Sequence, residues 1–299
     1  MARDRTGRRL NSEGKNDNNP NPNSAGARSV DGFETGSISG TYAVVLETGA
    51  NEVSALGVID CDGEGNLLGD IRFNELDEEN PPARALTTSA LSGTYSLESN
   101  GLGELTIEGE EFGEAFSLPA GILVTEVQGS TAVSVDGNFL VPSGEDGALT
   151  LFTMTKRDSD FGDGSLIGNY AFEVIAGPNL GHANGVMTFD GEGGFTGQLK
   201  GNAPKDNTER DLFETPLMGT YSTEHHGYVE MNLTFVVMKD DVPFIPVTLL
   251  ITEAEGTQAS NLKGNFGIPS PILQSMNLPS LMTVKLDYIG SSGTTIKTE

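Results

Sequence analysis

Apolar and polar residues alternate along many short stretches of the chain. In residues 170–174 (YAFEV) every second side chain is aromatic or aliphatic, and Glu173 falls between them. Residues 229–235 (VEMNLTF) follow the same two-residue period. In residues 42–46 (YAVVL), Tyr42, Val44 and Leu46 take the corresponding places. This period predicts strands of an antiparallel sheet, with one face buried and the other in water.

The first half of the chain contains eight such stretches, separated mostly by short turns that contain glycine. No amphipathic helix of useful length interrupts them. Eight antiparallel strands with one apolar face remove their exposed edges most simply by closing into an up-and-down barrel, and a two-sheet β-sandwich is the alternative. The expected strands are residues 41–47, 54–61, 66–76, 91–98, 102–109, 114–127, 131–140 and 148–156.

The chain also repeats itself. GTYA at 40–43 matches GNYA at 168–171, and DGEG occurs at both 62–65 and 190–193, each at an offset of 128 residues. GTYS at 93–96 returns at 219–222, at an offset of 126. Solenoid units have periods of roughly 20–50 residues, so each copy is expected to be a complete domain. The sequence predicts an all-β protein with two tandem eight-stranded antiparallel barrels, at residues 37–158 and 165–291.

Composition narrows the classes of partner. The chain has 39 glycines, 14 prolines, no tryptophan and a formal net charge of −26. A body this acidic repels phosphate groups, so we expect no nucleic-acid binding, and no apolar run is long enough for membrane insertion. Residues 1–36, with the polar segment NDNNPNPNSAG, are expected to be a disordered tail.

Three features suggest chemistry, and each has a simpler explanation. Asp60, Asp62 and Glu64 are spaced like calcium ligands, but the second copy retains only the glycine spacing, which favours a hairpin turn over a weak metal site. Three histidines have no counterpart in the other copy, and the pair at 225–226 falls at an expected hairpin tip. Cys61, the only cysteine, lies on an apolar face and is expected to be a buried, unreactive thiol. We therefore expect no catalytic residues, no metal and no cofactor.

The repeated motifs resemble a known type of domain. Tandem units of this length with G-x-Y, D-G-x-G and a second GTY are similar to the lipocalin-like (calycin-like) β-barrel repeats of uncharacterised exported bacterial proteins. Tyr42 and Tyr170 stand where lipocalins have the tryptophan of their Gly-x-Trp signature. The resemblance covers residues 38–290 and implies an exported or cell-surface bacterial protein. Because the N-terminus lacks the apolar centre of a signal peptide, a cytoplasmic location is the alternative.

Three functions are compatible with these features. The first is a non-catalytic binding or interaction module that holds a small apolar molecule inside a lipocalin-like barrel. The second is a structural or surface-display protein whose barrels are filled by side chains, and the third is a barrel-type cyclase or isomerase, although the sequence favours a protein that is not an enzyme. Oligomeric state is left open. The residues expected to line a barrel cavity are Tyr42, Phe73, Tyr95, Tyr170, Phe172, Phe189, Phe195 and Tyr221.

Overall fold

The computed structural model describes most of the chain from Gly32 onward. The described residues are 32–48, 54–76, 84–111, 113–139, 150–157, 160–175, 182–204, 209–235, 245–267 and 281–291. Gly32–Glu299 form a compact unit. Residues 1–31 of the predicted tail lie outside the described part. The tail prediction is wrong for residues 32–36, because the Phe33 amide donates to the Ser99 carbonyl and the 3-10 turn η1 (Thr35–Ser37) precedes the first strand.

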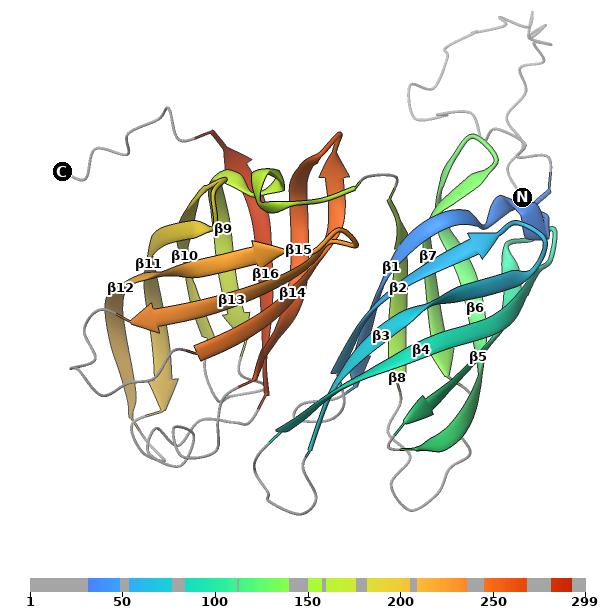
Figure 1. Cartoon of the computed structure of the whole chain (residues 1–299), viewed down its shortest axis with the longest axis horizontal. Coiled ribbons are helices and arrows are strands. Elements are labelled where there is room, and N and C mark those ends of the chain that lie inside the picture. Colours follow the sequence, from blue (N-terminus) through green and yellow to red (C-terminus); the bar gives the residue numbers. More distant parts are fainter. Residues whose placement is uncertain are drawn as a thin grey trace, which may run out of the picture. The chain divides into compact units, whose positions relative to one another are not determined.

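The first copy is a closed barrel, called barrel 1 below. Each strand pairs antiparallel with the next, and the eighth strand closes on the first (Figure 1). The barrel alternative of the sequence prediction is therefore confirmed over the sandwich. The fourth strand begins at Arg84, not at residue 91 as the pattern suggested. The strands are β1 (Ser39–Thr48), β2 (Ser54–Asp62), β3 (Asn66–Leu76), β4 (Arg84–Leu97), β5 (Leu102–Glu111), β6 (Glu114–Gln128), β7 (Thr131–Phe139) and β8 (Thr150–Lys156).

The second copy repeats this architecture as barrel 2. The 3-10 turn η2 (Asp163–Ser165) precedes it, as η1 precedes barrel 1, and its last strand pairs with its first. The two predicted barrel ranges, 37–158 and 165–291, enclose these two sets of strands. The strands are β9 (Ile167–Ile175), β10 (His182–Asp190), β11 (Gly194–Pro204), β12 (Arg210–Thr223), β13 (Tyr228–Phe235), β14 (Ile245–Glu255), β15 (Gln258–Gly267) and β16 (Leu281–Gly290).

The alternating pattern accounts for the two cores. Tyr170, Phe172 and Val174 of β9 belong to one buried apolar cluster inside barrel 2, whereas Glu173 between them is exposed. The corresponding residues of β1, Tyr42, Val44 and Leu46, belong to a separate cluster inside barrel 1. Each barrel therefore has its own core, built from the inward side chains of all its strands.

Candidate functional site

The eight side chains expected to line a cavity lie inside the barrels and are buried. All eight belong to the two interior clusters, and their exposed fractions run from 0% for Tyr42 and Tyr170 to 8% for Phe73. These fractions show that protein atoms cover nearly the whole surface of each of the eight side chains. Their role as ligand contacts stays a prediction.

Aromatic rings fill the centre of barrel 2. The Phe189 ring centroid lies 5.2 Å from that of Tyr170, 5.1 Å from that of Tyr221 and 5.4 Å from that of Phe195. The first two contacts are edge-to-face, the arrangement that the ring quadrupoles favour. These rings therefore stabilise one another inside barrel 2.

Barrel 1 has Cys61 at the position of Phe189. This cysteine is 5% exposed and belongs to the interior cluster. Burial, together with the charges of Asp60 and Asp62, raises the pKa of its thiol to about 12. The thiol therefore stays protonated at neutral pH. The expectation that this cysteine is buried is confirmed, and its lack of reactivity stays a prediction.

The tyrosines of the repeated motifs tie the barrel interior to the backbone. Tyr95 and Tyr221, from the two GTY motifs, donate to carbonyls beside the 3-10 turns that precede each barrel, and burial raises the pKa of both to about 12. The motif therefore has a structural explanation in both copies. The bonds form two pairs, with one member of each pair in each barrel. The first pair is Tyr42 Oη to Ala132 O (2.7 Å) and Tyr170 Oη to Ala259 O (2.8 Å), and the second is Tyr95 Oη to Ile38 O (2.6 Å) and Tyr221 Oη to Leu166 O (2.9 Å).

The DGEG segments are hairpin turns held by their first aspartate. Asp62 Oδ1 accepts from the amides of Glu64 (2.7 Å) and Asn66 (3.0 Å), and Asp190 makes the equivalent pair of bonds in barrel 2. The Asn66 side chain and then these amides lower the pKa of Asp62. Because the carboxylates of Asp62 and Asp190 accept these bonds, a hairpin turn explains why both copies have the same DGEG spacing. No group of three metal-ligating side chains occurs among the described residues.

The histidines lie on exposed surface. His182 Nε2 is 2.9 Å from Glu173 Oε1, and His225 Nε2 is 3.5 Å from Asp160 Oδ1. The pair at 225–226 lies in the turn between β12 and β13, which the Gly227 amide closes by donating to the Glu224 carbonyl at 2.8 Å. The expected hairpin tip is confirmed.

A third apolar cluster lies outside both interiors and joins the two barrels. It combines outward side chains of β1 and β2 with Tyr228 of β13 and Leu250 of β14. Tyr228 is 1% exposed and Leu250 is fully buried. We call these contacts, with the polar groups around them, the junction. The cluster members from barrel 1 are Ala43, Val45, Leu56 and Val58.

Arg72 of β3 is the central polar group of the junction. Its Nη2 lies 2.6 Å from Glu224 Oε2 and its Nη1 lies 2.8 Å from Glu230 Oε1, both in barrel 2. Its guanidinium also lies 3.8 Å from the centroid of the Tyr228 ring. The Tyr228 hydroxyl donates to Asp70 Oδ1 at 2.8 Å. Burial and the Asp70 charge raise the pKa of Tyr228.

Arg157, which directly follows β8, joins the junction from the connecting segment. It is 6% exposed, and its guanidinium donates to the carbonyls of Ile251 (3.0 Å) and His226. It also lies 5.4 Å from the Phe161 ring centroid. Burial lowers its pKa to about 10, so the side chain remains charged at neutral pH.

The duplication does not reproduce the junction. At the positions of Tyr228 and Leu250, barrel 1 has Leu102 and Leu123, which are 50% and 44% exposed. At the position of Val45, barrel 2 has the exposed Glu173. Each barrel therefore presents a different outer face to its neighbour. Reasoning from the repeat missed the junction, although one signal was present: β1 is apolar at Ala43 and Val45 as well as on its inward face.

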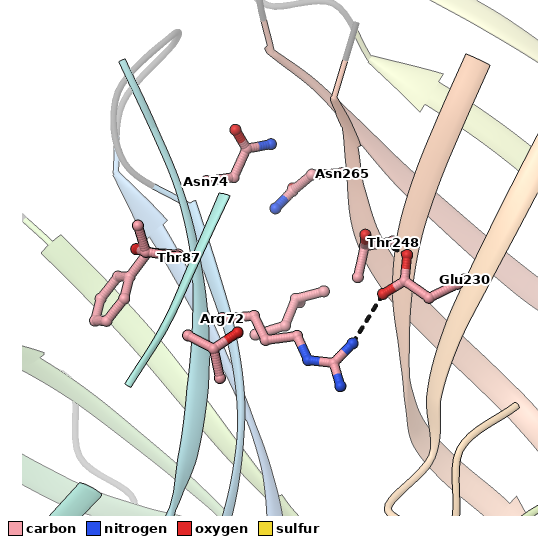
Figure 2. A pocket seen from close by; sticks show the side chains of 9 residues that line it. Arg72, Asn74, Thr87, Glu230, Thr248 and Asn265 are labelled. Carbon is pink, nitrogen blue, oxygen red and sulfur yellow. Dashed lines mark hydrogen bonds and ion pairs between the residues drawn. The ribbon is translucent and has the colours of Figure 1, made fainter. Parts of the chain in front are cut away.

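A pocket of about 170 Å³ lies beside the Arg72–Glu230 ion pair. Figure 2 shows Arg72 and Asn74 of β3 on one side of it, and Glu230, Thr248 and Asn265 of barrel 2 on the other. Among the lining residues, Asn74 and Asn265 are buried, whereas Thr88 is exposed. The complete lining is Leu56, Arg72, Phe73, Asn74, Thr87, Thr88, Glu230, Thr248 and Asn265.

Comparison with known proteins adds no relative. A scan of protein-family models found no match, and searches of curated proteins and of solved structures found none either. In the described part of the chain, no helix is long and apolar enough to cross a membrane. The functional argument therefore rests on the geometry of the barrels and of the junction.

Proposed function

We propose that the protein is a non-catalytic interaction module in which two side-chain-filled barrels are held together and present their outer surfaces to partners. The observation that carries this proposal is the burial of the eight inward candidates, none of which is more than 8% exposed. A lipocalin-like carrier needs an interior cavity of roughly 300 Å³ or more for a drug-sized ligand. Filled interiors favour the structural alternative over the carrier and over a barrel-type cyclase or isomerase.

The chemistry of the interiors supports the same choice. An enzyme of this type needs an ionisable group with a shifted pKa inside a pocket that substrate can enter. The shifted interior groups, Cys61, Tyr95, Tyr170 and Tyr221, are buried in packed clusters, where burial favours their neutral forms. Such groups stabilise the fold and do not act as acids or bases near neutral pH.

Charge and contacts define the kind of partner. A net charge of −26 opposes binding to nucleic acids and to anionic lipid surfaces, and it favours cationic or neutral partners. Tyr228, Arg72 and Arg157 connect the barrels through buried and charge-assisted contacts, so both barrels act together as one display unit. An exported or cell-surface location, as the family resemblance implies, suits such a unit.

Native mass spectrometry tests the proposal. The full-length protein is exposed to a mixed lipid and metabolite extract, desalted and measured without detergent. We expect no apolar adduct on the chain before or after exposure. An apolar adduct that survives in the wild-type protein and is lost when Phe189 is enlarged to Trp would contradict the proposal, because it would place a ligand inside barrel 2.

A further inference from the structure

We infer that the outer face of β5 and β6 in barrel 1 is a docking surface for another protein, one that presents an arginine beside small aliphatic side chains. We call this surface the open face, and it consists of Glu98, Leu102, Glu104 and Leu123. The inference rests on the proposed function, because it names the partner surface that such an interaction module accepts.

The open face is the barrel 1 copy of the surface that barrel 2 contributes to the junction. Leu102 pairs with Leu123 across β5 and β6, and the equivalent pair in barrel 2 crosses β13 and β14. That pair, Tyr228 and Leu250, is 1% and 0% exposed and belongs to the apolar cluster that joins the barrels. None of the described residues covers the two leucines to the same extent, and they stay about half exposed. The apolar part of the open face is therefore available to another protein.

Both carboxylates that bind Arg72 in the junction have counterparts on the open face. Glu224 and Glu230 lie 2.6 Å and 2.8 Å from the arginine nitrogens. Glu98 and Glu224 occupy equivalent turns, in which the amide of each donates to the carbonyl of the first residue of the next strand. Glu104 and Glu230 have the same place in the pairing of their strands, each opposite a serine. The open face therefore repeats the carboxylate pair of an arginine site.

The open face has no cation of its own. Residues 85–155, which include all of β5, β6 and β7, contain no lysine, arginine or histidine. Glu98 and Glu104 are exposed, and Glu98 Oε2 accepts from the Asn100 side chain at 3.2 Å. A carboxylate accepts at about four positions, so this one bond leaves room for a guanidinium. Arginine complements the pair best, because its fixed set of donors matches carboxylate oxygens.

A second copy of the chain does not offer the required surface. In the junction, barrel 1 has Arg72 opposite Leu56, and Leu56 opposite Val45. The exposed residues that barrel 2 has at these three positions are Lys200, Asn184 and Glu173. The Glu173 carboxylate would meet the leucines and glutamates of the open face, which opposes docking. The partner is therefore a different protein that retains the arginine and the aliphatic side chains.

The required surface can be built on barrel 2 of the full-length chain, so that the protein itself is the probe. The triple variant Glu173→Val, Asn184→Leu, Lys200→Arg copies the three barrel 1 residues onto exposed positions of β9, β10 and β11. We expect this variant to associate head to tail, through its new surface and the open face of the next copy, and the wild-type chain to stay monomeric.

Analytical ultracentrifugation measures the association. Salt at about 0.15 M limits the self-repulsion of the acidic chains, because the Debye length is then about 8 Å. Protein concentrations up to about 0.5 mM reveal an association whose Kd is millimolar or tighter. Circular dichroism establishes that each variant is folded.

Charge reversal provides the matched control. In the triple variant, a further Glu104→Lys sets a cation against the new arginine and should weaken the association about tenfold or more. Glu108→Lys makes the same charge change on the same strand and outer face. It lies about 13 Å further along β5, which exceeds the Debye length, so it should change the Kd by less than about twofold.

A triple variant that stays monomeric would overturn the inference, and so would equal association in the Glu104→Lys and Glu108→Lys forms. Association of the wild-type chain that Glu104→Lys abolishes would also overturn it, because a second copy would then be the partner. None of these results changes the adduct mass that tests the filled barrels, so the proposed function and this inference can fail separately.

Discussion

The Tyr228 hydroxyl provides the sharpest test of the junction. Its bond to Asp70 Oδ1 is 2.8 Å long, and the ring beneath it is 1% exposed. Tyr228→Phe removes only the hydroxyl and keeps the ring stacked under Arg72, 3.8 Å from the guanidinium carbon. A hydrogen bond to a charged group contributes about 1.5–3 kcal/mol. Because the Asp70 residue is only half-buried, water can partly replace the hydroxyl, and we expect the lower end, about 1.5 kcal/mol.

A second substitution at the same position separates the ring from the hydroxyl. Tyr228→Leu installs the residue that barrel 1 has at the equivalent position, Leu102. Tyr228→Leu also removes the contact between the ring and Arg72, which stabilises the folded state by about 0.5–2 kcal/mol more. The free energy of unfolding should therefore fall in the order wild type, Tyr228→Phe, Tyr228→Leu.

Urea unfolding followed by circular dichroism measures these differences. Tyr288→Phe is the matched control, because the Tyr288 ring packs against Tyr170 but its hydroxyl has no hydrogen-bond partner within the described residues. We expect the control to stay within about 0.5 kcal/mol of wild type. Equal effects of Tyr228→Phe and Tyr288→Phe would refute the argument that the Tyr228–Asp70 bond stabilises the junction.

Further predictions concern the buried tyrosines, two glycines and the packing of barrel 2. Burial raises the pKa of Tyr95, Tyr170 and Tyr221, and burial together with the Asp70 charge raises the pKa of Tyr228. The folded state therefore holds these hydroxyl protons more tightly than the unfolded chain, in which tyrosine has a pKa of about 10. The contribution of these tyrosines to the free energy of unfolding should be constant below about pH 10 and fall above it. Phenolate absorbance and circular dichroism, measured together across this range, test the prediction. A free energy of unfolding that stays unchanged up to about pH 12 would contradict it. Gly219→Ala should prevent or severely weaken folding, because a Cβ there would lie 2.0 Å from the Asn232 carbonyl oxygen, whereas Gly164→Ala meets open space and should leave the melting temperature near that of wild type. Phe189→Trp should lower the free energy of unfolding by about 1–3 kcal/mol, since the extra ring has no space in a filled interior, and an unchanged value in urea unfolding would argue for an open barrel.

The barrels were predictable because their determinants are local or repeated. Alternation of apolar residues along β9 and β13 assigns the inward face. The duplicated GTY segments mark equivalent strands, β4 and β12, and the duplicated DGEG segments mark equivalent turns. The start of β4, at Arg84, was missed by seven residues. The tail was placed five residues too far into the chain because Phe33 hydrogen bonds with a residue 66 positions away, Ser99, and a local pattern does not reveal that contact.

The junction and its pocket depend on contacts between outer faces of two barrels. Glu104 and Glu230 occupy equivalent positions and alternate in the same way along their strands, so both are expected to face solvent. Only in the folded structure does Glu230 meet Arg72, which comes from the other copy, 158 residues away in the chain. Alternation identifies an outer face and does not identify what covers it.

Xenon NMR tests the central claim, that the barrel interiors are filled, most directly. Xenon enters apolar cavities without needing a specific ligand chemistry, so it reports empty space itself. We predict that the wild-type protein shows no saturable xenon site inside the barrels, and that Phe189→Ala, which removes the ring at the centre of the barrel 2 cluster, creates one. A saturable site in the wild-type protein whose methyl shifts map to residues such as Met187 and Leu199 would contradict filled barrels and return the protein to the class of ligand carriers.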